Sequence, residues 1–132
     1  MTNAIRLNAF ASFALFTLLQ VGFVMSSFAQ TGNIAAGEKA FQKCVYCHQV
    51  GPSARNILGP HLNGIVGRPA GSVKNFAYSP AMKKSGIVWT EEQLRDFVRK
   101  PGKVVPDNNM RFFGLWSDTE ASNLVAYLRT VK

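Results

Sequence analysis

The residues best placed to do chemistry form one short run, Cys44-Val45-Tyr46-Cys47-His48, which holds both cysteines and one of the two histidines of the chain. A C-x-x-C-H run is the attachment sequence for a c-type haem. Its two thiols can form thioether bonds to the vinyl groups at one edge of the macrocycle, and the histidine that follows can present an imidazole nitrogen to iron. We therefore expect one haem c, covalently attached through Cys44 and Cys47, with His48 as an iron ligand.

Three other uses of the two cysteines fit the sequence less well. A thioredoxin-type redox pair needs a βαβ context, which the helical pattern described below does not supply. A structural zinc site needs two further ligands, and His61 is the one remaining histidine. A disulfide between cysteines three positions apart closes a very small loop and adds little stability.

An iron ligated by His48 needs a second axial ligand or an open position. Beyond the apolar N-terminal segment, the candidate donors are His61, Met82 and Met110. Met82 falls in a short predicted helix, where an apolar residue is most often core, and a lone histidine in a Gly-Pro loop is most often a surface or supporting residue. Met110 follows a polar, extended segment where a methionine has little packing role, so we favour it. A thioether ligand raises the reduction potential, as an electron carrier requires.

The elements that must position these residues are predicted to be helical. Apolar residues recur at helical spacing over residues 33–47, which lead into the cysteines. Cap residues and stop signals predict three further helices: one between Ser79 and Gly86, one from Thr90 to Pro101 and one from Ser117 onward. Residues 48–78 are rich in Gly and Pro and show no sustained period. Such a long loop needs an internal partner, and with no strand alternation the sequence predicts an all-α domain.

The first 29 residues are predicted to be a secretory signal. Arg6 precedes an apolar run over residues 9–25, and Ser27 and Ala29 provide small residues at the −3 and −1 positions of a cleavage site. The expected organisation is a signal at residues 1–29 and one domain at residues 30–132. Because the run is slightly short of the ~20 residues that span a bilayer, an uncleaved membrane anchor is the alternative. If the chain is exported, we expect the protein in the bacterial periplasm. If the segment is kept as an anchor, we expect it at the periplasmic face of the inner membrane.

The charge of the chain suggests its partners. Among 132 residues there are fifteen Lys and Arg against seven Asp and Glu, a net charge of +8. This length excludes a multidomain enzyme, and without a nucleic-acid-reading motif we expect no nucleic-acid partner. Lys43 lies beside the first cysteine, and Lys100, Lys103 and Arg111 flank Met110. We expect these four residues to surround the haem edge of a monomer and to steer it to acidic redox proteins or membrane respiratory complexes.

The order of these residues resembles that of class I cytochrome c, especially the soluble, mitochondrial-like bacterial members. The match runs from about Asn33 to Val131 and includes, in order, Gly37, Phe41, Cys44-x-x-Cys47-His48, Gly59-Pro60-x-Leu62, Gly67-Arg68-x-x-Gly71, Tyr78, Trp89, Pro101, Pro106, Met110 and Tyr127. The resemblance implies the cytochrome c fold, in which about four to five helices and long loops surround one haem. It also implies that His48 is the proximal iron ligand and Met110 the distal one.

Several supporting roles follow from the same resemblance. The carbonyl of Pro60 is expected to accept the second imidazole N–H of His48, which fixes the tautomer of the ring. Arg68, Tyr78 and Trp89 are expected around the two haem propionates, because carboxylates in a partly buried site need donors and a cation. The resemblance also implies that Gly37, Phe41 and Tyr127 lie where the first and last helices cross.

Two positions depart from the pattern of the family. Phe97 stands where many members have a tyrosine whose hydroxyl bonds to the distal sulfur, and Asn108 stands where a threonine is common. Because a phenyl ring cannot donate that hydrogen bond, we expect a shifted reduction potential and an altered alkaline ligand exchange.

The expected ligand set also predicts the class of activity. An iron with both axial positions filled by protein has no place for a substrate, so we expect an electron carrier and not an enzyme. It would shuttle single electrons between respiratory or dehydrogenase partners. The alternatives are a peroxidase-like haem enzyme or enzyme subunit with a labile distal ligand, and a membrane-tethered carrier.

Overall fold

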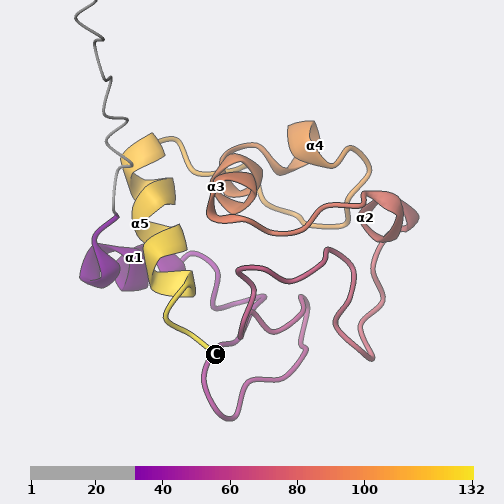
Figure 1. The fold of residues 1–132 in the computed structure, drawn as a ribbon, viewed down its shortest axis with the longest axis horizontal. Coiled ribbons are helices and arrows are strands. Elements are labelled where there is room, and N and C mark those ends of the chain that lie inside the picture. The colour runs from indigo at the N-terminus through magenta and orange to yellow at the C-terminus, as the bar shows by residue number, and fades with distance from the viewer. Residues whose placement is uncertain (1–31) are drawn as a thin grey trace, which may run out of the picture.

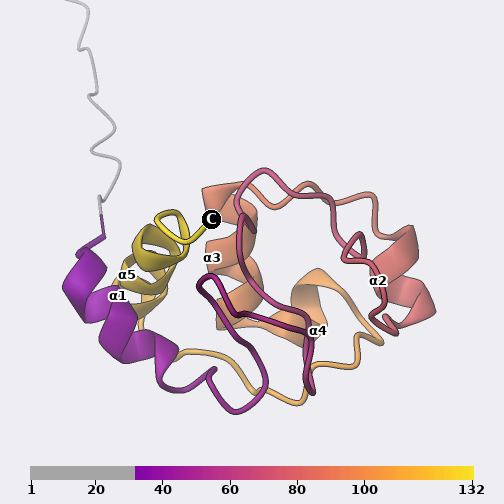
Figure 2. The same ribbon diagram turned by 90° about the horizontal axis from the view of Figure 1, so that it is seen from below.

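The computed structural model describes residues 32–132, so the predicted signal at residues 1–29 lies outside the described part of the chain. Five helices occur there: α1 (Ile34–Phe41), α2 (Pro80–Lys84), α3 (Glu91–Arg99), α4 (Pro101–Val104) and α5 (Asp118–Leu128). Helices α1 and α5 lie on one side, α2 on the other, and α3 and α4 between them (Figures 1 and 2). Residues 32–132 contain one isolated β-bridge and no named strand, which confirms the all-α class.

No helix in the described range is both long and apolar enough to cross a membrane.

Side-chain caps begin four of the helices. A cap oxygen accepts a hydrogen bond from one of the N–H groups that the first helical turn leaves without a partner. The backbone N–H of Ala36 donates to Asn33 (2.8 Å), that of Met82 to Ser79 (3.1 Å), that of Gln93 to Thr90 (3.1 Å) and that of Glu120 to Ser117 (3.3 Å). The helix starts predicted at Ser79, Thr90 and Ser117 are therefore confirmed.

One predicted helix boundary was wrong, and one short helix was not predicted. Helix α1 ends at Phe41, and residues 42–47 form turns in place of the helix predicted to residue 47. The backbone tightens there, because the N–H groups of Lys43 and Cys44 bond to carbonyls three residues back. Pro101 ends α3 as predicted, but it also begins the one-turn helix α4, since proline suits the first helical position.

The crossing of α1 and α5 fixes the chain that leads into the cysteines. A Cβ at Gly37 would lie 1.9 Å from the carbonyl oxygen of Asn123, so only glycine allows this close approach. The rings of Phe41 and Tyr127 pack with centroids 5.5 Å apart. These contacts confirm the crossing predicted for Gly37, Phe41 and Tyr127.

Backbone hydrogen bonds hold the long loop of residues 48–78 against the helical part of the domain. The N–H of Gly67 bonds to the carbonyl of Trp89 (2.8 Å), and the N–H of Trp89 bonds to the carbonyl of Arg68 (3.0 Å). The N–H of Gly64 reaches the carbonyl of Val131 (2.9 Å) near the C-terminal end. The loop is therefore ordered, as predicted, and it is bonded to the segments that precede α3 and follow α5.

Candidate haem-binding site

A cavity of about 620 Å³ lies where a small helical domain would normally pack its core. It is bounded by the loop of residues 48–78, by helices α3 and α5 and by the segment around Met110. Its wall is mainly apolar and includes Leu62, Ile65, Leu94, Phe97, Val98, Leu124 and Leu128. An apolar space of this size needs an apolar occupant to stabilise the fold.

The wall of this cavity brings together all the site residues predicted from the sequence. They are Cys44, Cys47, His48, Pro60, Arg68, Tyr78, Trp89 and Met110. Of the two other candidate iron ligands, Met82 also lines the cavity, whereas His61 is absent from the described lining. The structure thus leaves two thioethers, those of Met82 and Met110, as possible partners for the imidazole of His48.

The imidazole of His48 is held in one orientation. Its Nδ1 donates to the carbonyl oxygen of Pro60 at 2.7 Å, which leaves the lone pair of Nε2 available. A Cβ at Gly59 would lie 2.4 Å from Cε1 of His48, so glycine makes room for the ring. Burial lowers the pKa of His48 and favours the neutral imidazole, the form that binds a metal.

The two cysteines lie on a tight turn at the edge of the cavity. The N–H groups of Cys47 and His48 both bond to the carbonyl oxygen of Cys44, at 3.0 and 2.9 Å. Burial, and then the neighbouring Cys47, raise the pKa of the Cys44 thiol to about 11 in this fold. The surroundings of Cys44 therefore favour an uncharged sulfur, which a thioether provides.

One part of the wall carries polar groups. The guanidinium of Arg68 donates to the carbonyl oxygens of Asn63 (2.8 Å) and His61 (3.0 Å), which fixes its position. Burial raises the pKa of Tyr78, so its phenol stays a neutral donor. The buried ring of Trp89 packs against Phe97 with centroids 4.9 Å apart. A cation with two aromatic donors suits carboxylates, and the predicted propionate contacts of Arg68, Tyr78 and Trp89 stay a prediction.

Asn108 supports the segment that carries Met110, a role that the sequence did not suggest. Its Oδ1 accepts from the N–H of Met110 at 2.9 Å, and its Nδ2 donates to the carbonyl of Val105 at 2.7 Å. The side chain thus links the end of α4 to Met110. The sequence feature that could have indicated this role is the position of the asparagine directly after Pro-Asp. This combination is typical of turns in which the side chain bonds to the backbone.

The described residues fit a covalently attached haem. The cavity is apolar, two thiols and a neutral histidine lie at its wall, and an arginine supplies a positive charge. Phe97 lies within the same wall and is 7 % exposed, so its phenyl ring is buried beside the site.

Comparisons with known proteins extend over the same region. A family model described as Cytochrome c matches residues 34–132, which include the whole cavity wall. Cytochrome c2 from Blastochloris viridis is 44 % identical over 101 residues, with 76 % of this chain and 80 % of that protein covered. Cytochrome c-550 from Nitrobacter winogradskyi is 46 % identical over 97 residues, with 74 % and 89 % covered. The solved structure of cytochrome cH from Methylobacterium extorquens superposes with a TM-score of 0.71 at 40 % identity and covers 75 % of this chain and 99 % of its own.

Proposed function

Because the chain belongs to the cytochrome c family, which carries haem c and transfers electrons, we propose that this protein is a periplasmic shuttle with His48 and Met110 as its iron ligands. It exchanges single electrons with respiratory or dehydrogenase partners. The observation that supports this most is the shared cavity, whose wall contains the cysteine pair, the oriented imidazole of His48 and the thioether of Met110.

Each described group has a part in this function. The haem, attached through Cys44 and Cys47, supplies a one-electron couple. The carbonyl of Pro60 orients the ring of His48 and burial keeps that ring neutral, so that Nε2 is the ligating atom. The thioether of Met110 would favour the reduced state of the iron and would keep a substrate from binding it. The apolar wall excludes water, so the reorganisation energy for the change of oxidation state stays small.

Replacing Asn108 with alanine should weaken the hold on Met110. Asn108→Ala removes two hydrogen bonds that tie the Met110 segment to the end of α4. Since each hydrogen bond contributes about 1 kcal/mol, the loss of two should let cyanide displace the distal ligand with an apparent affinity about thirtyfold higher. A cyanide titration of the oxidised protein, followed optically, measures this affinity.

The neighbouring Asn109→Ala is the matched control. Asn109 is exposed, and its side chain makes no hydrogen bond among residues 32–132. Equal cyanide affinities for Asn108→Ala and the unchanged protein would show that Asn108 does not position the distal ligand.

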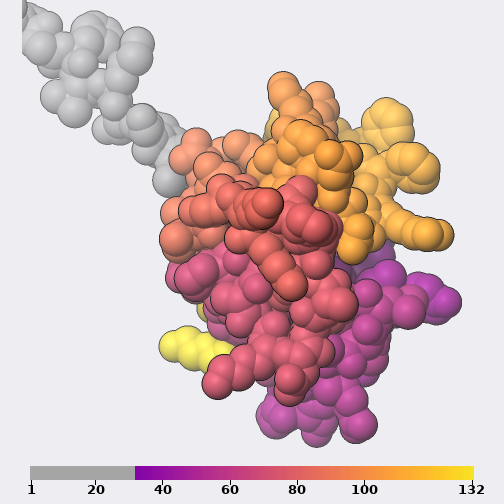
Figure 3. All heavy atoms as spheres, turned by 90° about the vertical axis from the view of Figure 1, so that its right-hand side faces the viewer, coloured from indigo at the N-terminus to yellow at the C-terminus, as the bar shows by residue number. Residues whose placement is uncertain are grey.

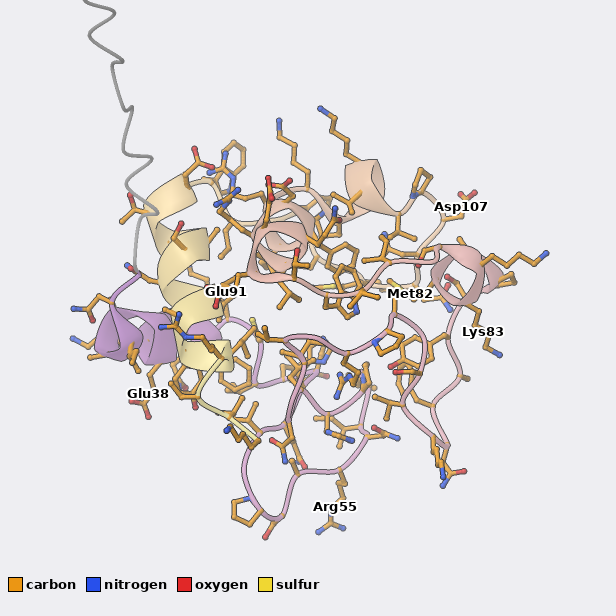
Figure 4. The ribbon with its side chains drawn as sticks, viewed as in Figure 1. Glu38, Arg55, Met82, Lys83, Glu91 and Asp107 are labelled. Carbon is orange, nitrogen blue, oxygen red and sulfur yellow. The ribbon has the colours of Figure 1, made fainter. Side chains whose placement is uncertain are left out.

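Charge is unevenly distributed over the described surface. Six of the acidic residues lie on α1, α3 and α5, and most of them form ion pairs with nearby cations. Basic residues without an ion pair among residues 32–132 include Lys74, Lys83, Lys84, Lys100, Lys103 and Arg111. Figure 4 places Glu38 on α1 at one end and Lys83 on α2 at the other, with Asp107 at the same end as Lys83.

The four predicted steering residues differ in their surroundings. Lys43 and Arg111 both line the cavity, but Lys43 forms an ion pair with Glu120 at 2.5 Å that offsets its charge. Lys100 directly precedes α4, Lys103 lies within it, and both are exposed. We therefore assign most of the steering to Lys100, Lys103 and Arg111.

Electron transfer to an acidic partner should slow as salt is added. Screening shortens the range of the attraction from about 30 Å at 0.01 M salt to about 3 Å at 1 M. We expect the second-order rate to fall by about tenfold or more over this range, as stopped-flow mixing would measure. The triple variant Lys100→Gln, Lys103→Gln, Arg111→Gln should be slower and less salt-dependent. Lys39→Gln, on the exposed face of α1, is the control, and a rate independent of salt would contradict steering.

The periplasmic location rests on residues 1–29 as an export signal. Cleavage after Ala29 would place the mature protein outside the cytoplasm, where a C-x-x-C-H sequence of an exported chain receives its haem. N-terminal sequencing of the mature protein tests this proposal. A mature sequence that begins at Gln30 would support it. A mature protein that still contains residues 1–29 would favour the tethered carrier.

A further inference from the structure

Two large aromatic side chains of the described chain are fully exposed. Phe113 is 102 % exposed and Trp116 is 94 % exposed, more than any other large hydrophobic residue in residues 32–132. They lie on the segment between Met110 and α5, from which side chains project at the upper right of Figure 3, in golden orange. The haem cavity does not explain these rings, because neither lines it.

The backbone under the two rings is fixed, so their exposure is a property of the fold. Leu115 lies between them, is buried, and donates its N–H to the carbonyl of Val98 at 2.8 Å. Gly114 has a φ of +107°, and a Cβ there would lie 2.0 Å from the carbonyl oxygen of Arg99. The guanidinium of Arg99 donates to the carbonyl of Trp116 at 2.9 Å. The segment is therefore held on α3 with both rings outward.

The surroundings of the rings indicate what could cover them. Arg111 and Phe112, which directly precede Phe113, line the haem cavity. Arg111 and Lys100 have no ion-pair partner among the described residues, whereas Arg99 is paired with Asp118 at 3.1 Å. A body that buries the rings would therefore also lie close to residues of the cavity wall and to the unpaired charge of Arg111.

We propose that Phe113 and Trp116 form an aromatic anchor that enters an apolar pocket with an acidic rim on the redox protein that exchanges electrons with this chain. This inference rests on the proposed function. Aromatic residues at the centre of an interface carry much of its binding energy, and rings on a fixed backbone lose little freedom on binding. A protein fits better than a lipid surface, because only a protein brings a redox centre close to this part of the cavity wall.

The test compares Trp116→Ser and Phe113→Ser with the unchanged holoprotein. The electron acceptor is the membrane fraction of the producing organism, washed free of soluble cytochromes, and ferricyanide serves as a small acceptor that needs no pocket. We expect Trp116→Ser to raise the KM for oxidation by membranes about tenfold or more, with kcat, reduction potential and ferricyanide rate unchanged. Trp116→Tyr should recover most of the loss. Ile34→Ser, which removes an exposed apolar side chain from α1, should change nothing.

Other results would overturn the inference. An unchanged KM for both serine variants would show that the rings do not dock. Loss of binding to phosphatidylglycerol vesicles with an unchanged KM for the detergent-solubilised acceptor would assign the rings to a lipid surface. Self-association that Trp116→Ser abolishes, with an unchanged KM, would assign them to a second copy of this chain. A different result would contradict the proposed function itself. In that case the unchanged protein would pass electrons to ferricyanide but would exchange none with any membrane component.

Discussion

The double variant Cys44→Ser, Cys47→Ser should lack covalent haem and should be largely unfolded. The long loop, α3 and α5 all contribute to the wall of the cavity of about 620 Å³, and without its occupant these elements lose their shared packing. Burying a few hundred Å² of macrocycle at ~25 cal/mol/Å² contributes on the order of 10 kcal/mol. The whole stability of a small domain is about 5–15 kcal/mol. Far-ultraviolet circular dichroism of the purified variant should show most of its helical signal lost.

A matched control separates haem loss from damage to the turn. Val45→Ser changes an exposed residue between the two cysteines and should keep both the haem and the fold. A double serine variant that keeps its helical signal and melts cooperatively without haem would show that the chain builds its core unaided.

Replacing Met110 should change the iron site far more than replacing Met82, although both thioethers line the same cavity. Met110→Ala opens the distal position, so the oxidised protein should lose its thioether-to-iron charge-transfer absorption and bind cyanide readily. Because a thioether ligand raises the potential, its loss should lower the reduction potential by on the order of 0.1 V or more. Potentiometric titration measures the change.

Met82→Leu is the control for this comparison. Met82 is 8 % exposed and lies on α2, where its N–H is capped by Ser79, so a leucine of similar size should keep the packing and the spectrum. If Met82→Leu loses the charge-transfer absorption while Met110→Ala keeps it, the distal ligand is Met82.

Local chemistry made much of the fold predictable from the sequence. Ser79, Thr90 and Ser117 cap the helices that they were predicted to begin, because a cap bond joins residues three positions apart. The C-x-x-C-H run predicted haem c for the same reason, since its chemistry lies within five consecutive residues. The end of α1 was missed because the apolar spacing continues to Cys44 after the backbone has tightened.

Features that depend on contacts between distant residues were not predictable. The ion pair of Lys43 with Glu120 joins residues 77 positions apart, and it changes which cations are free to steer a partner. The outward orientation of Trp116 depends on Leu115 bonding to α3, and a hydrophobic residue is otherwise expected in the core. The effect of Phe97 on the reduction potential stays a prediction.

The optical spectrum of the purified protein, oxidised and then reduced, tests the central claim most directly. Covalent haem c with His48 and Met110 as ligands predicts a low-spin spectrum in both states and, in the oxidised state, a thioether-to-iron charge-transfer absorption at the near-infrared edge. Cyanide should bind slowly. A high-spin oxidised spectrum without that absorption, with rapid binding of cyanide or peroxide, would contradict the assigned ligand pair and the carrier function.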